Sequence, residues 1–145
     1  MEIIVKKSKI LLYLSSLLIL IHFAGHLIGH LSWKVPKDAN MQNAVAAMIQ
    51  NKANYMGAYR SFADFYHGYS LILFVVYILS IWVLMVLANG IRKDIRFAKS
   101  VLLPFGIAYI SFAVIEFRQF FLFAASISAL TGLLILLSML SLRRY

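Results

Sequence analysis

The chain has 145 residues, of which 63% are hydrophobic and 13% carry a charge. Soluble domains contain about 45–50% apolar residues, so this composition excludes an ordinary soluble protein and indicates an integral membrane protein. The net charge of +9 does not indicate nucleic-acid binding, because the basic residues flank apolar runs, and the absence of cysteine excludes disulfides, iron–sulfur clusters and thiolate zinc sites.

Four apolar runs are each long enough to cross a membrane, for which an α-helix needs roughly 20 residues. We expect transmembrane helices over residues 8–32, 65–90, 97–117 and 119–142. The third run is the shortest, but the long charged side chains at its ends can reach the membrane interface. The last two connections are short, so the sequence predicts one all-α domain, a four-transmembrane-helix up-down-up-down bundle.

The first expected helix carries three histidines in the segment HFAGHLIGH. His22, His26 and His30 recur every four residues, so all three lie on one stripe of the helix. Gly25 and Gly29 border this stripe, and we expect them to let a neighbouring helix approach closely. At about 1.5 Å per residue from the inner boundary, the row extends from the outer half of the bilayer to its outer interface.

The loop between the first two transmembrane helices, from about residue 32 to residue 63, contains a further amphipathic pattern. Apolar residues at helical spacing over residues 41–52 predict a short amphipathic interfacial helix that lies on the membrane surface. Trp33, Tyr66 and Tyr69 fall near the same boundary. Such residues are typical of the aromatic belt at the level of the lipid headgroups.

Ionisable side chains also gather at the outer ends of the other helices. Asp64 and His67 are three residues apart, so we expect the carboxylate to accept a hydrogen bond from the imidazole. Glu116 ends the third helix, Arg118 opens the fourth, and Arg60 precedes the second. Because ionisable groups at membrane depth are costly, we expect these side chains to face the bundle interior and to form one site with the histidines.

The first interpretation of this site is a metal centre. Imidazole and carboxylate ligands suit zinc or non-haem iron, and the candidate ligands are His22, His26, His30, His67 and Glu116. The second interpretation is haem, with a histidine of the first helix and His67 as axial ligands. In that arrangement, Arg60 and Arg118 bind the propionates.

Two further interpretations need no metal or haem. In one, a membrane-embedded enzyme or proton relay acts on a lipophilic substrate, with Glu116, Asp64 and His26 as candidate catalytic residues. In the other, the same groups form a satisfied hydrogen-bond network that fixes helix register and binds no ligand. Of the four, we expect a site that binds a metal ion or a small ligand; whether the chain is an enzyme stays open.

The distribution of basic residues predicts the orientation in the membrane. Nine lie on the face that includes both termini and the connection between the second and third helices, and five lie on the other face. The positive-inside rule therefore predicts cytoplasmic termini. The first apolar run is long enough to span and is followed by no typical cleavage site, so we expect a retained helix rather than a signal peptide. The nine residues are Lys6, Lys7, Lys9, Arg92, Lys93, Arg96, Lys99, Arg143 and Arg144.

Small residues in the fourth expected helix favour close contact between helices. Ala125, Ser128, Ala129 and Gly132 form two pairs at a spacing of four residues, a pattern common at membrane helix interfaces. Small-residue stripes of this kind also leave a homodimer open. Together with the apolar runs and the polar site, this pattern gives three expected partners: the lipid bilayer, a small lipophilic ligand and a second copy of the chain.

Three segments carry the most distinctive residue patterns. They are G-H-x-x-G-H at residues 25–30, M-G-x-x-R-S-x-x-D-F-Y at residues 56–66 and A-V-I-E-F at residues 113–117. With these segments the chain resembles a family of small bacterial four-span integral membrane proteins of uncharacterised function, over residues 11–140. The resemblance implies a four-helix protein of the bacterial inner membrane and implies no activity, substrate or cofactor.

Overall fold

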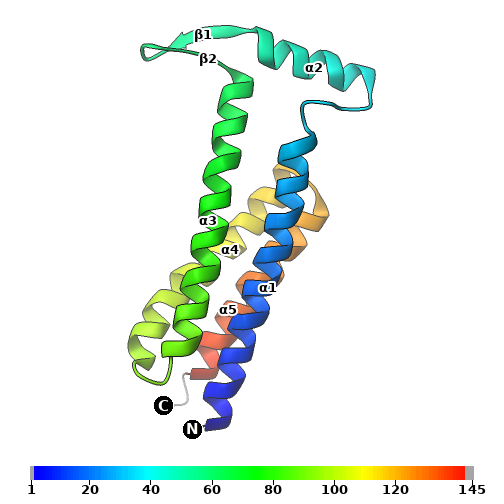
Figure 1. Cartoon of the computed structure of the whole chain (residues 1–145). Coiled ribbons are helices and arrows are strands. Elements are labelled where there is room, and N and C mark those ends of the chain that lie inside the picture. The colour runs from blue at the N-terminus through cyan, green and yellow to red at the C-terminus, as the bar shows by residue number, and fades with distance from the viewer. Residues whose placement is uncertain (1, 143–145) are drawn as a thin grey trace. The chain divides into compact units, whose positions relative to one another are not determined.

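The structure is a computed structural model, and it describes residues 2–142. Within this range, four helices are long and apolar enough to cross a membrane, so the chain is a multi-pass membrane protein. The expected all-α fold, with four spanning helices and a short helix after the first, is confirmed. The elements are α1 (Glu2–Ser32), α2 (Ala39–Gln50), β1 (Lys52–Tyr55), β2 (Ala58–Ser61), α3 (Phe62–Gly90), α4 (Ile95–Gln119) and α5 (Leu122–Ser141) (Figure 1).

The described residues form two compact units. The first unit takes its residues from 1–22 and 77–145, and the second contains residues 23–76. The helices α4 and α5 belong to the first unit, whereas α2 and the two strands belong to the second. Because α1 and α3 continue from one unit into the other, each of them contributes side chains to both.

Three of the spanning helices begin earlier than expected. The helix α1 begins at residue 2 rather than 8, α3 at residue 62 rather than 65, and α4 at residue 95 rather than 97. The expected starts followed the edges of the apolar runs, but charged residues do not end a helix. Capping residues set two of these starts: at α4, for example, a side-chain oxygen of Asp94 accepts the Phe97 N–H at 2.8 Å.

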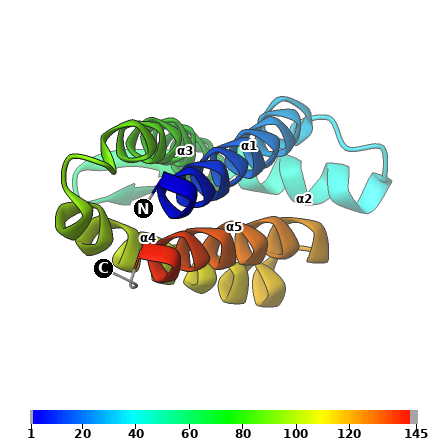
Figure 2. The same ribbon diagram turned by 90° about the horizontal axis from the view of Figure 1, so that it is seen from below.

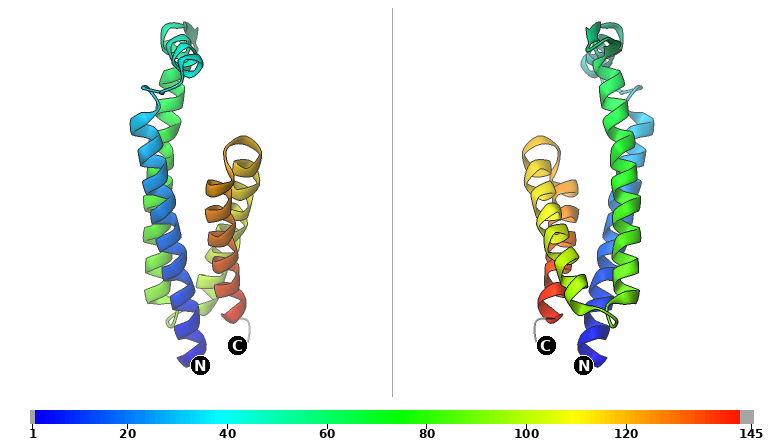
Figure 3. Two further views of the ribbon diagram at one scale, coloured as in Figure 1. Left: turned by 90° about the vertical axis from the view of Figure 1, so that its right-hand side faces the viewer. Right: turned by 90° about the vertical axis from the view of Figure 1, so that its left-hand side faces the viewer.

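In the first unit, α4 and α5 lie side by side (Figure 2, Figure 3). A Cβ atom added to Gly132 would lie 3.0 Å from the carbonyl oxygen of Gly106, and one added to Gly106 would lie 2.6 Å from the Leu136 side chain. The expected close contact at Gly132 is therefore confirmed. By contrast, no described atom lies within 4 Å of a Cβ added to Gly25 or Gly29, so the close helix approach expected there is not found among the described residues.

Buried polar side chains also join α1 to α5 within the first unit. The hydroxyl oxygens of Ser8 and Ser138 are 2.6 Å apart, and further along α1 the Ser128 hydroxyl lies 3.4 Å from Nδ1 of His22. Residue numbers rise along α1 while they fall along α5, so the two helices are antiparallel at this contact. The buried residues of α1 repeat at intervals of three or four and include Ser8, Leu12, Ser15, Ile19 and His22.

In the second unit, α2 is the short helix expected over residues 41–52, but it begins and ends earlier. Asp38 caps its N-terminus and accepts the Met41 N–H at 3.0 Å. The helix ends at Gln50, and the chain enters a strand at Lys52. Val45 is its buried residue, which agrees with the apolar stripe predicted from the spacing.

The second unit also contains a β-hairpin that the sequence did not lead us to expect. The strands β1 and β2 are antiparallel, and Tyr55 pairs with Ala58, so the turn consists of Met56 and Gly57. Both turn residues have positive φ, 50° and 89°, as in the type I′ turns that match the twist of a hairpin. The side-chain oxygen of Asn54 accepts the Gly57 N–H at 2.9 Å and holds the turn closed.

Candidate functional site

The structure divides the predicted site residues between the two units. The first cluster, in the first unit, contains His22 and Glu116. The second cluster, in the second unit, contains His26, His30 and His67. The side chains that we expected in one site therefore come from both units.

The centre of the first cluster is a histidine–glutamate pair. Nε2 of His22 on α1 lies 3.4 Å from Oε1 of Glu116 on α4, and the two side chains are only 10% and 14% exposed. The other ring nitrogen, Nδ1, lies 3.4 Å from the hydroxyl of Ser128 on α5. The same hydroxyl is close enough to the Glu116 carboxylate to interact with it. Three helices therefore place an imidazole, a carboxyl group and a hydroxyl together.

Two buried tyrosines complete the first cluster, and the sequence had not pointed to them. The ring of Tyr77 on α3 lies 5.0 Å from the His22 ring, measured between centroids. Tyr109 on α4 lies within electrostatic reach of Glu116 and is 2% exposed. Tyr109 precedes Glu116 by seven residues, which places both on one face of α4, so helical spacing from Glu116 is the signal that identifies it.

Three buried oxygen atoms in the first unit have no hydrogen-bond partner among residues 2–142. They are Oε2 of Glu116, the hydroxyl of Thr131 and the hydroxyl of Tyr109, which has the side chain of Ser80 nearby. Thr131 follows Ser128 by three residues and so lies on the same side of α5. Buried polar atoms in proteins are nearly always hydrogen-bonded, so unpartnered oxygens of this kind are the groups with which a bound molecule would interact.

The centre of the second cluster is Ser70 on α3, which the sequence had not singled out. Its hydroxyl lies 2.9 Å from Nε2 of His26 and 2.7 Å from Nδ1 of His30, and its side chain is buried. The edge of the Phe74 ring packs against both imidazoles. Ser70 follows His67 by three residues, so helical spacing from that histidine would have identified it.

The carbonyl oxygen of Ser70 fixes the role of one ring nitrogen. The Ser70 carbonyl, which can only accept, lies 3.3 Å from Nε2 of His26, so this nitrogen donates and carries a hydrogen. The Ser70 hydroxyl can then accept from His26 while it donates its single hydrogen to Nδ1 of His30. This assignment makes His26 and His30 a connected pair in which the proton position on one ring affects the other.

The rings of His30 and His67 lie 4.8 Å apart between centroids, with an angle of 31° between their planes. Axial ligands of a haem approach the iron from opposite faces of the macrocycle, with the iron and the porphyrin plane between them. Two rings in direct contact leave no space for that plane. In this arrangement His30 and His67 do not form the haem pair considered from the sequence.

The Asp64 carboxylate bonds to Ser61 rather than to His67. One oxygen of Asp64 accepts both the Ser61 N–H, at 2.8 Å, and the Ser61 hydroxyl, at 3.0 Å. In return, the Asp64 N–H donates to the Ser61 hydroxyl oxygen at 3.2 Å. This reciprocal arrangement is a capping box at the start of α3, so the position of Asp64 is explained by helix formation.

The two arginines expected beside a cofactor do not join either cluster. Arg60 is exposed on β2, where its guanidinium donates to the Tyr59 carbonyl at 3.3 Å. Arg118 is exposed in the last turn of α4. The carboxyl group of Glu116 interacts instead with His22.

Within residues 2–142, no group of three or more His, Asp or Glu side chains is arranged to hold one metal ion. Zinc sites in proteins use three or four side-chain ligands. The first cluster offers the pair of His22 and Glu116, and in the second cluster Nε2 of His26 and Nδ1 of His30 already bond to Ser70. A zinc or iron ion at either place would need ligands to move toward it.

The role of these clusters is inferred from their geometry. No protein family, no curated protein and no solved structure matches the chain. Chemically, the first cluster combines an acid, a base and unpartnered oxygens, whereas the hydroxyl of the second is already shared between two imidazoles. The first cluster is therefore the better candidate for binding and proton transfer.

Proposed function

We propose that the first cluster binds a small lipophilic molecule and exchanges a proton with it. The observation that carries this proposal is the Glu116 carboxyl group, whose Oε1 faces His22 while its Oε2 is buried without a partner among the described residues. As a carboxylate, Oε2 accepts a hydrogen bond from a ligand hydroxyl; when protonated, it donates to a ligand carbonyl. A molecule that reaches this depth through the membrane must itself be largely apolar.

The pair can move a proton without a metal. His22 has one ring nitrogen toward Glu116 and the other toward Ser128, so the ring can accept a proton on one side and release one on the other. A proton taken from the ligand by Glu116 would pass to Nε2 and form an imidazolium beside the carboxylate, and its return by the same route would restore the ligand. The acid–base enzyme and the proton relay considered from the sequence would both use this pair.

A small ligand is favoured over a metal ion and over a network with no ligand. The unpartnered Thr131 hydroxyl and the neighbouring Tyr109 hydroxyl suit hydrogen bonds to an organic molecule, whereas zinc prefers imidazole, thiolate and carboxylate ligands. A purely structural network would be expected to satisfy its own buried oxygens. The three unpartnered oxygens therefore favour a binding site in the first unit.

The first test is to identify a small molecule that copurifies with the protein. The full chain would be purified in polymer-bounded native membrane discs, extracted with organic solvent and analysed by mass spectrometry beside a Glu116→Gln variant. Arg118→Gln, an exposed change two residues away, is the matched control. We expect one small molecule to be enriched with the wild type and the control. Loss of a hydrogen bond to a charged group costs about 1.5–3 kcal/mol, so its occupancy should fall about 10- to 100-fold in Glu116→Gln.

Proton exchange is tested separately by infrared difference spectroscopy across a pH titration. A carboxyl band that changes with pH should be present in the wild type, absent in Glu116→Gln and retained in Arg118→Gln. Elemental analysis of the same samples tests the metal alternative. If no molecule is enriched and Glu116→Gln only lowers thermal stability, the group is structural and the proposal fails.

We further propose that the chain is a protein of the bacterial inner membrane, as its resemblance implies, and that both termini are cytoplasmic. The excess of basic residues on one face supports this orientation; two of those residues, Arg143 and Arg144, lie outside the described residues. The chain has no cysteine, so single substitutions Lys7→Cys and Lys37→Cys provide unique labels. In intact cells an impermeant maleimide should label position 37 and not position 7; the reverse result would invert the orientation.

A further inference from the structure

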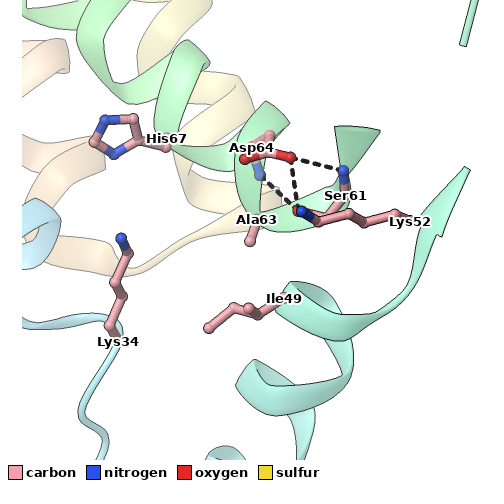
Figure 4. A pocket seen from close by; sticks show the side chains of 7 residues that line it. All are labelled: Lys34, Ile49, Lys52, Ser61, Ala63, Asp64 and His67. Carbon is pink, nitrogen blue, oxygen red and sulfur yellow. Dashed lines mark hydrogen bonds between the residues drawn. The ribbon is translucent and has the colours of Figure 1, made fainter. Parts of the chain in front are cut away.

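The second unit contains a pocket at the N-terminal end of α3 (Figure 4). Its volume is about 230 Å³, and it lies among residues of the loop after α1, α2, the hairpin and α3. All of these residues belong to the second unit. They are Lys34, Ile49, Lys52, Ser61, Ala63, Asp64 and His67.

Basic side chains dominate the lining. Lys34, Lys52 and His67 are basic, and Asp64 is the one acidic residue among the seven. The Asp64 carboxylate accepts two hydrogen bonds from Ser61 and stays negatively charged, so the two lysines outnumber it by one charge. Figure 4 shows the amino group of Lys34 directed toward the His67 ring across the pocket. The space between them is therefore suited to an anion.

The N-terminal end of α3, whose Asp64 N–H is already capped by Ser61, also lies at the pocket. Ala63, Asp64 and His67 lie in the first two turns of the helix, and the N-terminal end of a helix carries a partial positive charge from its aligned peptide dipoles. Phosphate groups bind at such ends in many proteins. Here the helix end is combined with lysine and histidine side chains from separate elements.

Aromatic residues beside the pocket support a position at the level of the lipid headgroups. The rings of Trp33 and Tyr66 lie 4.8 Å apart. Each of these residues is next in sequence to a residue that lines the pocket, Lys34 and His67 respectively. The Lys34 amino group is 5.6 Å from the centre of the Trp33 ring. Tryptophan and tyrosine concentrate at membrane–water interfaces. Ile49 supplies an apolar wall beside the charged groups.

We propose that this pocket binds the phosphate-bearing headgroup of an anionic phospholipid. The phosphate lies between Lys34 and His67, near the N-terminal end of α3, and the apolar part of the lipid leaves past Ile49. The pocket belongs to the second unit and is independent of the ligand proposed for His22 and Glu116. Free phosphate has the same recognition chemistry, so the test must separate the two sources.

The test is native mass spectrometry of the full chain in detergent, titrated with phosphatidylglycerol and with phosphatidylcholine of the same acyl chains. We expect phosphatidylglycerol to bind more tightly in the wild type. Each basic residue near an anionic headgroup contributes about 1 kcal/mol, so Lys34→Gln should weaken phosphatidylglycerol binding about fivefold. His67→Gln should weaken it as well, because the imidazole is the group that faces Lys34 across the pocket.

The matched control is Lys37→Gln, which removes an exposed lysine of the same loop that does not line the pocket. It should leave the preference for phosphatidylglycerol unchanged. Equal affinity for the two lipids, or equal losses in Lys34→Gln and Lys37→Gln, would overturn the proposal. Displacement of the lipid by millimolar inorganic phosphate would overturn the lipid assignment and identify a site for free phosphate.

Discussion

The hydroxyl oxygens of Ser8 and Ser138 lie 2.6 Å apart, and both side chains are fully buried where α1 meets α5. Each hydroxyl also lies within 3.4 Å of the other residue's carbonyl oxygen. Such reciprocal bonds between membrane helices replace contacts that lipid tails cannot provide. Substitution of either serine therefore measures how much one polar contact contributes to the stability of the first unit.

Removing one of these hydroxyls should weaken the first unit. Interhelical hydrogen bonds in membranes average about 0.6 kcal/mol and reach about 1.7 kcal/mol, so we expect Ser138→Ala to lower the free energy of unfolding within that range. Denaturant unfolding in mixed micelles measures the change. Ser126→Ala, an exposed serine of the same helix, is the control and should have little effect. Equal losses for both variants would contradict the prediction.

The contact between α4 and α5 should be sensitive to added volume. Gly132→Ala would bring a methyl group to 3.0 Å from a backbone oxygen and 2.9 Å from Ile110, whereas Gly106→Ala would first meet the flexible side chain of Leu136. Overpacking a dense core costs about 1–3 kcal/mol, and we expect Gly132→Ala to be the more damaging of the two because a backbone atom cannot turn aside.

The chain provides its own control for this prediction. Gly25→Ala replaces a glycine beside which no described atom lies within 4 Å of the new methyl group. Because alanine favours helix more than glycine does, this change should leave the unfolding free energy equal or slightly raised. A loss as large as that of Gly132→Ala would show that α1 packs closely at Gly25 after all.

The capping box at α3 should contribute to the stability of the first turn of that helix. Ser61→Ala removes both the acceptor for the Asp64 N–H and one donor to its carboxylate, and loss of such a cap costs about 0.5–2 kcal/mol. Hydrogen exchange at the first amides of α3 should accelerate accordingly. Ser32→Ala, an exposed serine that bonds within its own helix, should leave those amides unchanged.

The shared hydroxyl of Ser70 should determine the protonation pattern of two histidines. In nitrogen NMR spectra of the full chain, we expect neutral His26 to carry its hydrogen on Nε2, because the Ser70 carbonyl can only accept, and His30 to accept the Ser70 hydroxyl hydrogen on Nδ1. Ser70→Ala should change both signals together. Ser111→Ala, whose hydroxyl bonds its own helix, should change neither. Independent responses of the two rings would rule out the shared bond.

The lengths of the apolar runs were enough to predict the four spanning helices, because crossing the hydrocarbon core sets a minimum length for any helix. The hairpin was missed for a physical reason. All four residues of β1 are exposed, so no alternation of apolar and polar residues marks the strand. The available signal was Gly57, because glycine readily adopts the positive φ that the second position of a two-residue hairpin turn requires.

The site was predicted in part. The sequence pointed to His22, His26, His30 and Glu116, and each of them has a polar contact in the structure. Four residues are slightly more than one helical turn, so successive histidines rotate by about 40° around α1. That rotation lets His22 face Glu116 of α4 while His26 and His30 contact Ser70 of α3. The spacing alone does not say which helix each imidazole contacts.

The glycines at the α4–α5 contact restrict how this sequence can change over time. Because Gly106 and Gly132 each occupy space that a neighbour has already filled, a larger residue at either position needs a simultaneous reduction at Leu136 or Ile110. Descendants of this chain should therefore vary at these four positions in a correlated way. The exposed lipid-facing positions of the same helices are free to drift singly.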